Sequence, residues 1–318
     1  MKRNIIFLLL FAISAVAVSA QVRPPLPRPS SKAAVMQTVG TTEIAIIYAR
    51  PEMKGRLVFA DPSERMKAMV TGEATLDNVR DRKADEPLVA FGHLWRAGAN
   101  EATMFTVADD VLINGQPLPA GKYSLHMIPS KGEWTIIFNK ELDWGSFTYK
   151  AAQDALRVKT KAEWVADSKE LLTYGFEKVG EKSVTAYLRW DKAKVPFTIE
   201  VKDVVGSTIN RLKEYIAGDT KDAARLVNAA NYAKTNKLND QATAWFTEAL
   251  KVNDASIATK ETFVNLNRKA TILLNLDRRS DAIAAAERAL VVGKTDSNVT
   301  KAQLDALEKR IADLKAGK

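Results

Sequence analysis

Residues 111–139, VLINGQPLPAGKYSLHMIPSKGEWTIIFN, predict a series of short antiparallel strands. Val111-Leu112-Ile113 is followed by Asn114-Gly115, the dipeptide that most strongly favours a two-residue hairpin turn. Pro119-Ala120-Gly121 makes the next turn, and residues 122–128 make the next strand. Residues 134–139 are rich in aromatic and β-branched side chains and predict a further strand.

The same pattern extends over residues 36–204. Residues 183–190 and 195–201 flank Asp191-Lys192-Ala193-Lys194, which predicts another hairpin. Short strands with frequent turn signals predict an antiparallel β-sandwich or β-barrel. Residues 60–87 interrupt the pattern with many charged side chains, and we interpret them as a mobile surface insertion that could contain a short helix.

Past Gly206 the apolar pattern becomes helical, and several positions recur 40 residues later. The recurring pairs are Leu226 and Leu266, Ala230 and Ala270, Ala242 and Ala282, Phe246 and Ala286, and Ala249 and Ala289. This repeat resembles the tetratricopeptide pattern, so residues 206–318 are predicted to form a helical repeat-like domain. Two units are too few for a free-standing solenoid, so their apolar faces must pack on the β domain, on the tail itself or on a partner. The predicted fold class is α+β and multidomain: an antiparallel β-sandwich, then an all-α tail.

Residues 1–20 have the form of a secretory signal peptide. Lys2 and Arg3 precede an apolar stretch, and small residues allow cleavage between Ala20 and Gln21. We therefore expect a periplasmic or secreted protein with no transmembrane span after cleavage. Residues 21–35 hold four prolines and predict an extended, Pro-rich leader.

Composition excludes several kinds of chemistry. The 318-residue chain has no cysteine, which excludes disulfides, thiol nucleophiles and cysteine metal sites. Its two histidines, His93 and His126, lie far apart, so we expect no metal centre and no cofactor. The chain carries 47 basic and 38 acidic residues, a net charge of +9, without a basic cluster that is interleaved with aromatics, so nucleic acid is not an expected partner.

The stretch Trp95-Arg96-Ala97-Gly98-Ala99-Asn100-Glu101-Ala102-Thr103 holds the best candidates for a ligand site. Arg96, Asn100 and Glu101 could line a pocket, and Trp95 and Arg56 could join them. The alternative, which we favour, is structural: Arg96 and Glu101 form an ion pair that fixes a turn, Asn100 takes a left-handed backbone, and Gly98 allows a close approach. Of the tryptophans, we expect Trp134 in the core and Trp144 exposed, where it could bind a sugar face.

Several motifs in order resemble domain of unknown function 2911, a secreted bacterial family. The stretch from Trp95 to Thr103 carries this resemblance together with supporting motifs. These are Pro29-Ser30, Arg50-Pro51, Lys54-Gly55-Arg56, residues 118–125, residues 133–140, Trp144-Gly145 and residues 154–158. The resemblance covers residues 29–203 and implies an extracytoplasmic β domain, often with a helical tail, and no established activity. In this family only a few residues separate the Gly-Arg and Trp-Arg motifs, so residues 60–87 are a departure.

The leading hypothesis is a non-enzymatic binding or scaffold protein of the cell envelope. Its helical tail would present a groove to a protein partner, and its β domain would bind a glycan or small ligand. One alternative is a carbohydrate-active or other hydrolytic enzyme that uses Glu101 as an acid. The other is a carbohydrate-binding module that uses Trp144.

Overall fold

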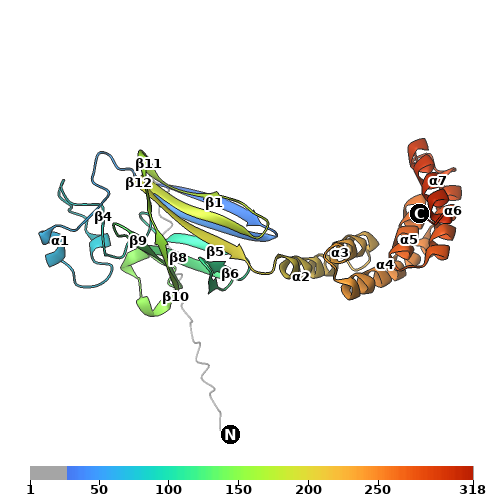
Figure 1. Ribbon diagram of the computed structural model, residues 1–318, viewed down its shortest axis with the longest axis horizontal. Coiled ribbons are helices and arrows are strands. Elements are labelled where there is room, and N and C mark those ends of the chain that lie inside the picture. The colour runs from blue at the N-terminus through green and yellow to red at the C-terminus, as the bar shows by residue number, and fades with distance from the viewer. Residues whose placement is uncertain (1–26, 318) are drawn as a thin grey trace, which may run out of the picture.

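A computed structural model describes residues 27–317. The predicted signal peptide, its cleavage point between Ala20 and Gln21, and residues 21–26 of the predicted leader lie outside the described residues. Two antiparallel sheets form the N-terminal part and a row of helices forms the C-terminal part, which confirms the predicted α+β fold class (Figure 1).

The larger sheet has six strands in the order β1-β2-β5-β8-β9-β10. They are β1 (Ser31–Val39), β2 (Thr42–Arg50), β5 (Thr103–Val107), β8 (Gly121–Ile128), β9 (Glu133–Asn139) and β10 (Asp154–Lys161). The smaller sheet has the order β11-β12-β6-β7. Its strands are β11 (Glu163–Glu177), β12 (Ser183–Val201), β6 (Val111–Ile113) and β7 (Gln116–Leu118). A short parallel pair, β3 (Phe59–Ala60) and β4 (Val89–Ala90), stands apart from both sheets.

The two larger sheets enclose one apolar core, as a sandwich requires. Tyr48 and Tyr174, from opposite sheets, meet edge to face with ring centroids 4.8 Å apart. Phe138 and Phe197 do the same at 6.1 Å. Trp134 is fully buried in this core, as predicted.

The predicted turn at Asn114-Gly115 is present between β6 and β7. Asn114 has φ 46° and Gly115 has φ 81°, so both residues adopt the left-handed conformation that this hairpin turn needs. The short-range turn signal was therefore sufficient to place this hairpin.

The hairpin predicted at residues 191–194 is wrong, because β12 runs without a break from Ser183 to Val201. Its inward-facing residues occupy even positions up to Trp190 and odd positions from Ala193 onward. Asp191 has φ 48°, and the register with β11 shifts at this point. The signal was therefore a bulge inside one long strand, not a turn between two.

The predicted leader also requires a correction. Strand β1 begins at Ser31, so the last residues of the range 21–35 belong to the sheet and pair with β2. Pro29 is the last proline of this segment. Because the residues after it have backbone N–H groups, they can form the hydrogen bonds of a strand.

Residues 60–87, which the sequence predicted to be mobile, contain a short helix and a small core. Helix α1 (Glu64–Ala68) is followed by a 3-10 turn, η1 (Leu76–Asn78). Met66 is fully buried and packs with Leu76 and Val79 in a cluster separate from the sandwich. Because a buried apolar cluster holds the insertion together, we expect these residues to be ordered rather than mobile.

A buried carboxylate ties the two ends of this insertion together. Glu86 is 3% exposed and accepts hydrogen bonds from Arg65 and from the Ser63 hydroxyl. The Arg65 hydrogen bond, with those from the Lys83 backbone and Ser63, holds the pKa of Glu86 well below its usual range. Glu86 is therefore ionised at neutral pH and acts as a structural anchor.

The tail consists of six helices whose limits repeat with the predicted spacing. They are α2 (Val204–Ala217), α3 (Ala223–Thr235), α4 (Asn239–Thr259), α5 (Phe263–Asn275), α6 (Arg279–Gly293) and α7 (Lys301–Lys315). Helices α3 and α5 start and end 40 residues apart, and so do the starts of α4 and α6. All the recurring positions predicted from the sequence are buried. The tail therefore contains two copies of one helix pair.

The tail packs on itself. Helix α2 contributes Ile209 to the core of the first helix pair, and α7 contributes Leu307 and Ile311 to that of the second. None of these six helices, nor α1, is long and apolar enough to cross a membrane in the part of the chain from 27 to 317.

One small contact joins the tail to the β domain. Val204 covers Gly40, where a Cβ would lie 2.4 Å from a Val204 methyl group. Arg211 forms an ion pair with Asp109, which also accepts a hydrogen bond from Thr42. Beyond this contact the tail extends away from the sandwich (Figure 1).

Candidate functional site

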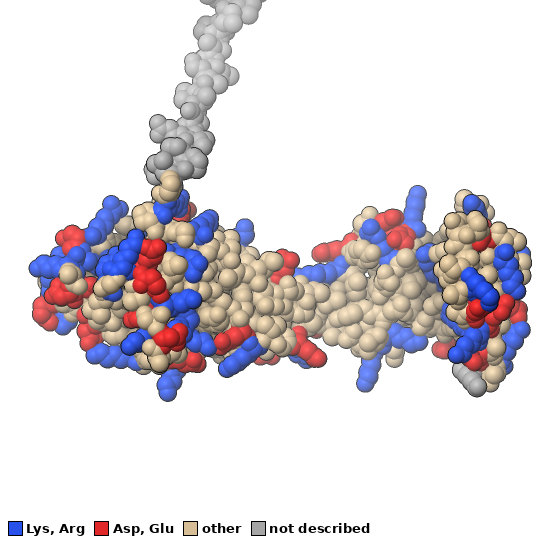
Figure 2. Space-filling view, turned by 90° about the horizontal axis from the view of Figure 1, so that it is seen from above, with Lys and Arg blue, Asp and Glu red and all other residues tan. Residues whose placement is uncertain are grey.

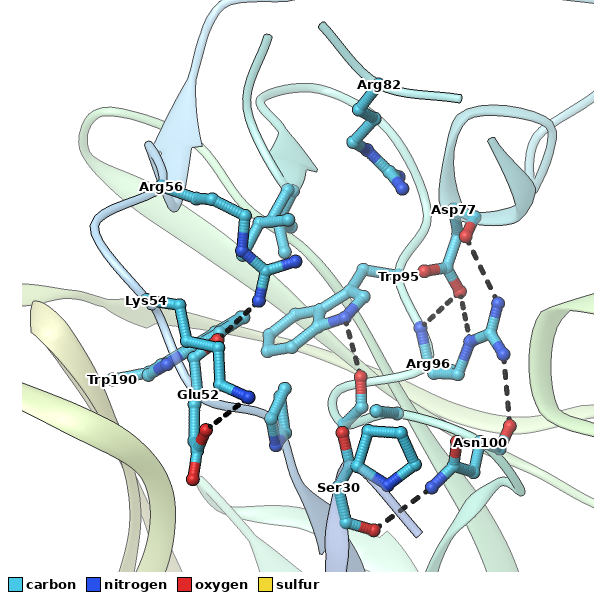
Figure 3. Close-up of a pocket in the computed structure, with 16 residues that line it drawn as sticks. Ser30, Glu52, Lys54, Arg56, Asp77, Arg82, Trp95, Arg96, Asn100 and Trp190 are labelled. Atoms are coloured by element: carbon cyan, nitrogen blue, oxygen red, sulfur yellow. Dashed lines mark hydrogen bonds and ion pairs between the residues drawn. The ribbon is translucent and has the colours of Figure 1, made fainter. Parts of the chain in front are cut away.

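A cavity of about 290 Å³ opens at the end of the sandwich where the insertion lies. Four segments of the chain, residues 29–30, 51–56, 77–89 and 95–100, line it together with β12 (Figure 3). The lining residues are Pro29, Ser30, Pro51, Glu52, Lys54, Arg56, Asp77, Arg82, Leu88, Val89, Trp95, Arg96, Gly98, Ala99, Asn100 and Trp190. Of the six candidate residues from the sequence, Arg56, Trp95, Arg96 and Asn100 meet here, while Glu101 and Trp144 do not.

Two indoles form the apolar wall of this cavity. Trp95 and Trp190 are 3% and 2% exposed and stack with ring centroids 5.9 Å apart. The Trp95 N–H donates to the Gly98 carbonyl, and the Trp190 N–H donates to the Glu170 carbonyl. Because both N–H groups are already used, the small part of each indole that reaches the cavity is apolar.

Arg96 is a structural clamp, and its partner differs from the one predicted. Its Nε lies 2.9 Å from Oδ2 of Asp77, and the two side chains are only 10% and 6% exposed. The guanidinium also donates to the backbone carbonyls of Asn100 and Asp77 and to the side chain of Asn78. The predicted Arg96–Glu101 ion pair is therefore wrong, because the insertion supplies a closer, buried carboxylate.

The backbone around the clamp has the features expected of a tight turn. Asn100 has φ 60°, and its side chain donates to the Ser30 carbonyl. A Cβ on Gly98 would lie 2.5 Å from the Thr103 hydroxyl, so only glycine fits there. Asn100 and Gly98 thus play the structural roles that the sequence suggested.

The remaining charges of the cavity are unbalanced. Lys54 forms an ion pair with Glu52 at 2.8 Å, and Arg96 forms one with Asp77 at 2.9 Å. Within residues 27–317, neither Arg56 nor Arg82 forms an ion pair. Arg82 was not among the residues predicted from the sequence. It lies in a charged stretch that was interpreted as mobile, and its spacing from Arg80 and Lys83 gives no signal of a site.

Glu101 and Trp144 line a second cavity of about 250 Å³, together with Asp143 and Lys32. Glu101 accepts a hydrogen bond from Arg28. Burial raises the pKa of the Glu101 carboxyl, but the Arg28 contact outweighs burial, and the net pKa lies below its usual range. An ionised carboxylate of this kind is poorly suited to act as a general acid at neutral pH.

Trp144 is 53% exposed, as the sequence predicted for the tryptophan beside Gly145. It precedes the short turn η2 (Gly145–Phe147), where Phe147 is 50% exposed and lies against the Arg96 guanidinium at 5.1 Å. Trp144 and Phe147 form an exposed aromatic edge: Trp144 lines the second cavity, and both rings line another hollow together with Arg96.

A groove of about 420 Å³ crosses the tail between α4, α5 and α6. Its apolar strip contains Leu250, Ile257, Leu266, Leu273, Ala284 and Ala285. Three ion pairs border the strip: Lys269 with Asp254, Arg288 with Glu261, and Arg278 with Asp281. The groove is therefore apolar along its floor and electrically neutral at its rim.

No group of three or more histidines, aspartates and glutamates within residues 27–317 has the geometry of a metal site. Lysine, arginine, aspartate and glutamate are mixed over both parts of the face that Figure 2 shows, without a large area of one sign.

A family model described as "Protein of unknown function (DUF2911)" matches residues 30–199. This match covers more than half of the chain, and the chain belongs to that family. No curated protein matches the sequence.

Proposed function

We propose that this DUF2911 protein is a non-enzymatic scaffold protein of the cell envelope, in which the helical tail docks a protein partner. The predicted signal peptide at residues 1–20 supports the location. The observation that carries the proposal is that the tail has its own core and covers the β core only through Val204.

A tail that only stabilised the β domain would lie against it and share its core. Here α2 and α7 cap the two helix pairs instead, and the rest of the tail extends into solvent (Figure 1). An extended, self-capped repeat is how helical repeat proteins present a binding surface. The tail is therefore built to bind something other than the β domain.

The groove between α4, α5 and α6 fits an amphipathic helix from a partner protein. The floor offers aliphatic side chains for the apolar face of such a helix. The rim offers charges of both signs, which can pair with a mixed polar face. A nucleic acid would require a basic rim, which this groove lacks.

Site-specific photo-crosslinking tests this proposal with the full chain in the cells that make it. A photo-reactive residue at Ala284, an exposed position in the groove, should give one discrete adduct with a partner protein. The matched control is Ala306, an exposed alanine on α7 outside the groove, which should give none. Ala284→Trp should then abolish co-purification of that partner, while Ala306→Trp leaves it intact. Identical adducts at both positions, or none at Ala284, would contradict the proposal.

A second candidate function is sugar binding at the exposed aromatic edge. Trp144 stands beside a cavity that Glu101 and Asp143 also line, and carboxylates and indoles together are typical of sugar sites. Soluble cell-wall glycan fragments should bind the wild-type protein and not Trp144→Ala. Phe147→Ala, on the same edge, tests whether the second ring contributes.

A further inference from the structure

We propose that the cavity beside Trp95 binds a small organic anion whose carboxylate or phosphate group lies between Arg56 and Arg82. This inference is independent of the proposed role of the tail, because it concerns only the β domain. It rests on the charges that remain after the internal ion pairs of the cavity are assigned.

Four cationic and two acidic side chains line the cavity. Glu52 and Asp77 each pair with one cation, Lys54 and Arg96 respectively. Two guanidinium groups, those of Arg56 and Arg82, therefore face the cavity without a carboxylate partner among residues 27–317. Figure 3 shows both above the Trp95 indole, with Arg56 toward the left and Arg82 toward the top.

The two arginines are held in place by backbone carbonyls. Arg56 donates to the carbonyls of Met53 and Glu52, at 2.9 Å and 2.6 Å. Arg82 donates to three carbonyls of its own segment, those of Pro87, Val79 and Leu76. Since a guanidinium has five N–H donors, each arginine keeps at least two for a ligand.

An oxyanion satisfies both groups at once. Carbonyl oxygens accept hydrogen bonds but do not neutralise a full positive charge, and Arg82 is half-buried. Burial lowers the pKa of Arg82; the charges of Asp77 and Glu86 oppose this effect, and those of Arg96 and Arg56 add to it. The planar fork of a guanidinium matches the two oxygens of a carboxylate or phosphate.

The rest of the cavity sets the size and character of the ligand. A volume of about 290 Å³ lies at the lower end of small-molecule sites, which span roughly 300–1,000 Å³. Trp95 and Trp190 offer stacked, apolar walls with no free N–H group. The ligand class is therefore a small molecule with one oxyanion and a flat or apolar body.

Four probes with the same ring test the assignment: benzoate, phenyl phosphate, neutral benzamide and cationic benzylamine. Binding to the full-length protein is followed by titration calorimetry and by the fluorescence of the tryptophans. Benzoate, phenyl phosphate or both should bind, and benzamide and benzylamine should bind at least about tenfold more weakly. A preference between the two anions tells whether the site is built for carboxylate or for phosphate.

Three variants locate the binding. Arg56→Gln should weaken binding of the anion at least about tenfold without unfolding the protein, because Arg56 is exposed and its deletion frees only two carbonyls. Arg82→Gln should weaken binding as well, but Arg82 also holds its own segment together. Arg80→Gln is the matched control, because Arg80 is exposed in the same segment and does not line the cavity.

The possible outcomes are distinct. Anion binding that is lost in Arg56→Gln and kept in Arg80→Gln supports the proposal. Equal binding of benzamide and benzoate would overturn it, as would anion binding that Arg56→Gln leaves unchanged. Failure of both anions to bind at millimolar concentration would also overturn it.

Discussion

The buried Asp77–Arg96 pair yields a prediction of large magnitude. Asp77 accepts two hydrogen bonds from Arg96, one from the backbone N–H at 3.0 Å and one from Nε at 2.9 Å. Asp77→Ala removes both hydrogen bonds. The Arg96 side chain, which is only 10% exposed, then keeps only neutral acceptors. Leaving such a charge unpaired typically lowers the free energy of unfolding by about 3–5 kcal/mol. We expect a loss in that range.

Urea denaturation, followed by tryptophan fluorescence, measures this loss. Five of the six tryptophans lie in the β domain, so the signal reports that part rather than the tail. Asp77→Asn keeps an acceptor oxygen and should cost less, roughly 1.5–3 kcal/mol. Glu64→Ala is the control, because its ion pair with Lys67 is exposed and should contribute less than about 1 kcal/mol. A loss below about 1 kcal/mol for Asp77→Ala would refute the view that Arg96 is a buried clamp.

Two further predictions concern pH and the junction with the tail. Burial lowers the pKa of His126 to about 4, against 6.5 when exposed, so the unfolded chain takes up the proton first as pH falls. The free energy of unfolding should therefore drop by roughly 3 kcal/mol between pH 7 and pH 4 through this residue alone, and urea denaturation of His126→Gln should show a correspondingly shallower pH dependence. Arg211→Ala removes the ion pair with Asp109 that joins α2 to the sandwich. It should broaden the distance distribution in small-angle X-ray scattering while changing the stability of the β domain by less than about 1 kcal/mol; an unchanged distribution would mean that the Val204 contact alone sets the orientation.

Local signals in the sequence were enough for much of the fold. The turn at Asn114-Gly115 depends on two residues, and the 40-residue repeat depends on alanines that are all buried. In contrast, a polar stretch such as residues 191–194 can be a turn or a bulge. Only the partner strand decides between them, because β11 absorbs the shift in register there.

The site was less predictable because its parts come from distant segments. Arg96 was expected to pair with Glu101, five residues away, but pairs with Asp77 in the insertion. Arg82 lines the cavity because the insertion folds around its own small core of Met66 and its neighbours. Such placement follows from tertiary packing, which residue types and spacing alone do not specify.

The length of β12 has a mechanical consequence. Only Lys202 and Asp203 separate this 19-residue strand from α2, so a pull on the tail enters the β domain along the strand axis. Strand β12 hydrogen-bonds to β11 on one side and to β6 on the other. Tension along it loads these bonds in shear, so that many must break together. Because Trp190 lies on the same strand, a partner that holds the tail under tension would strain the wall of the cavity at the far end of the sandwich.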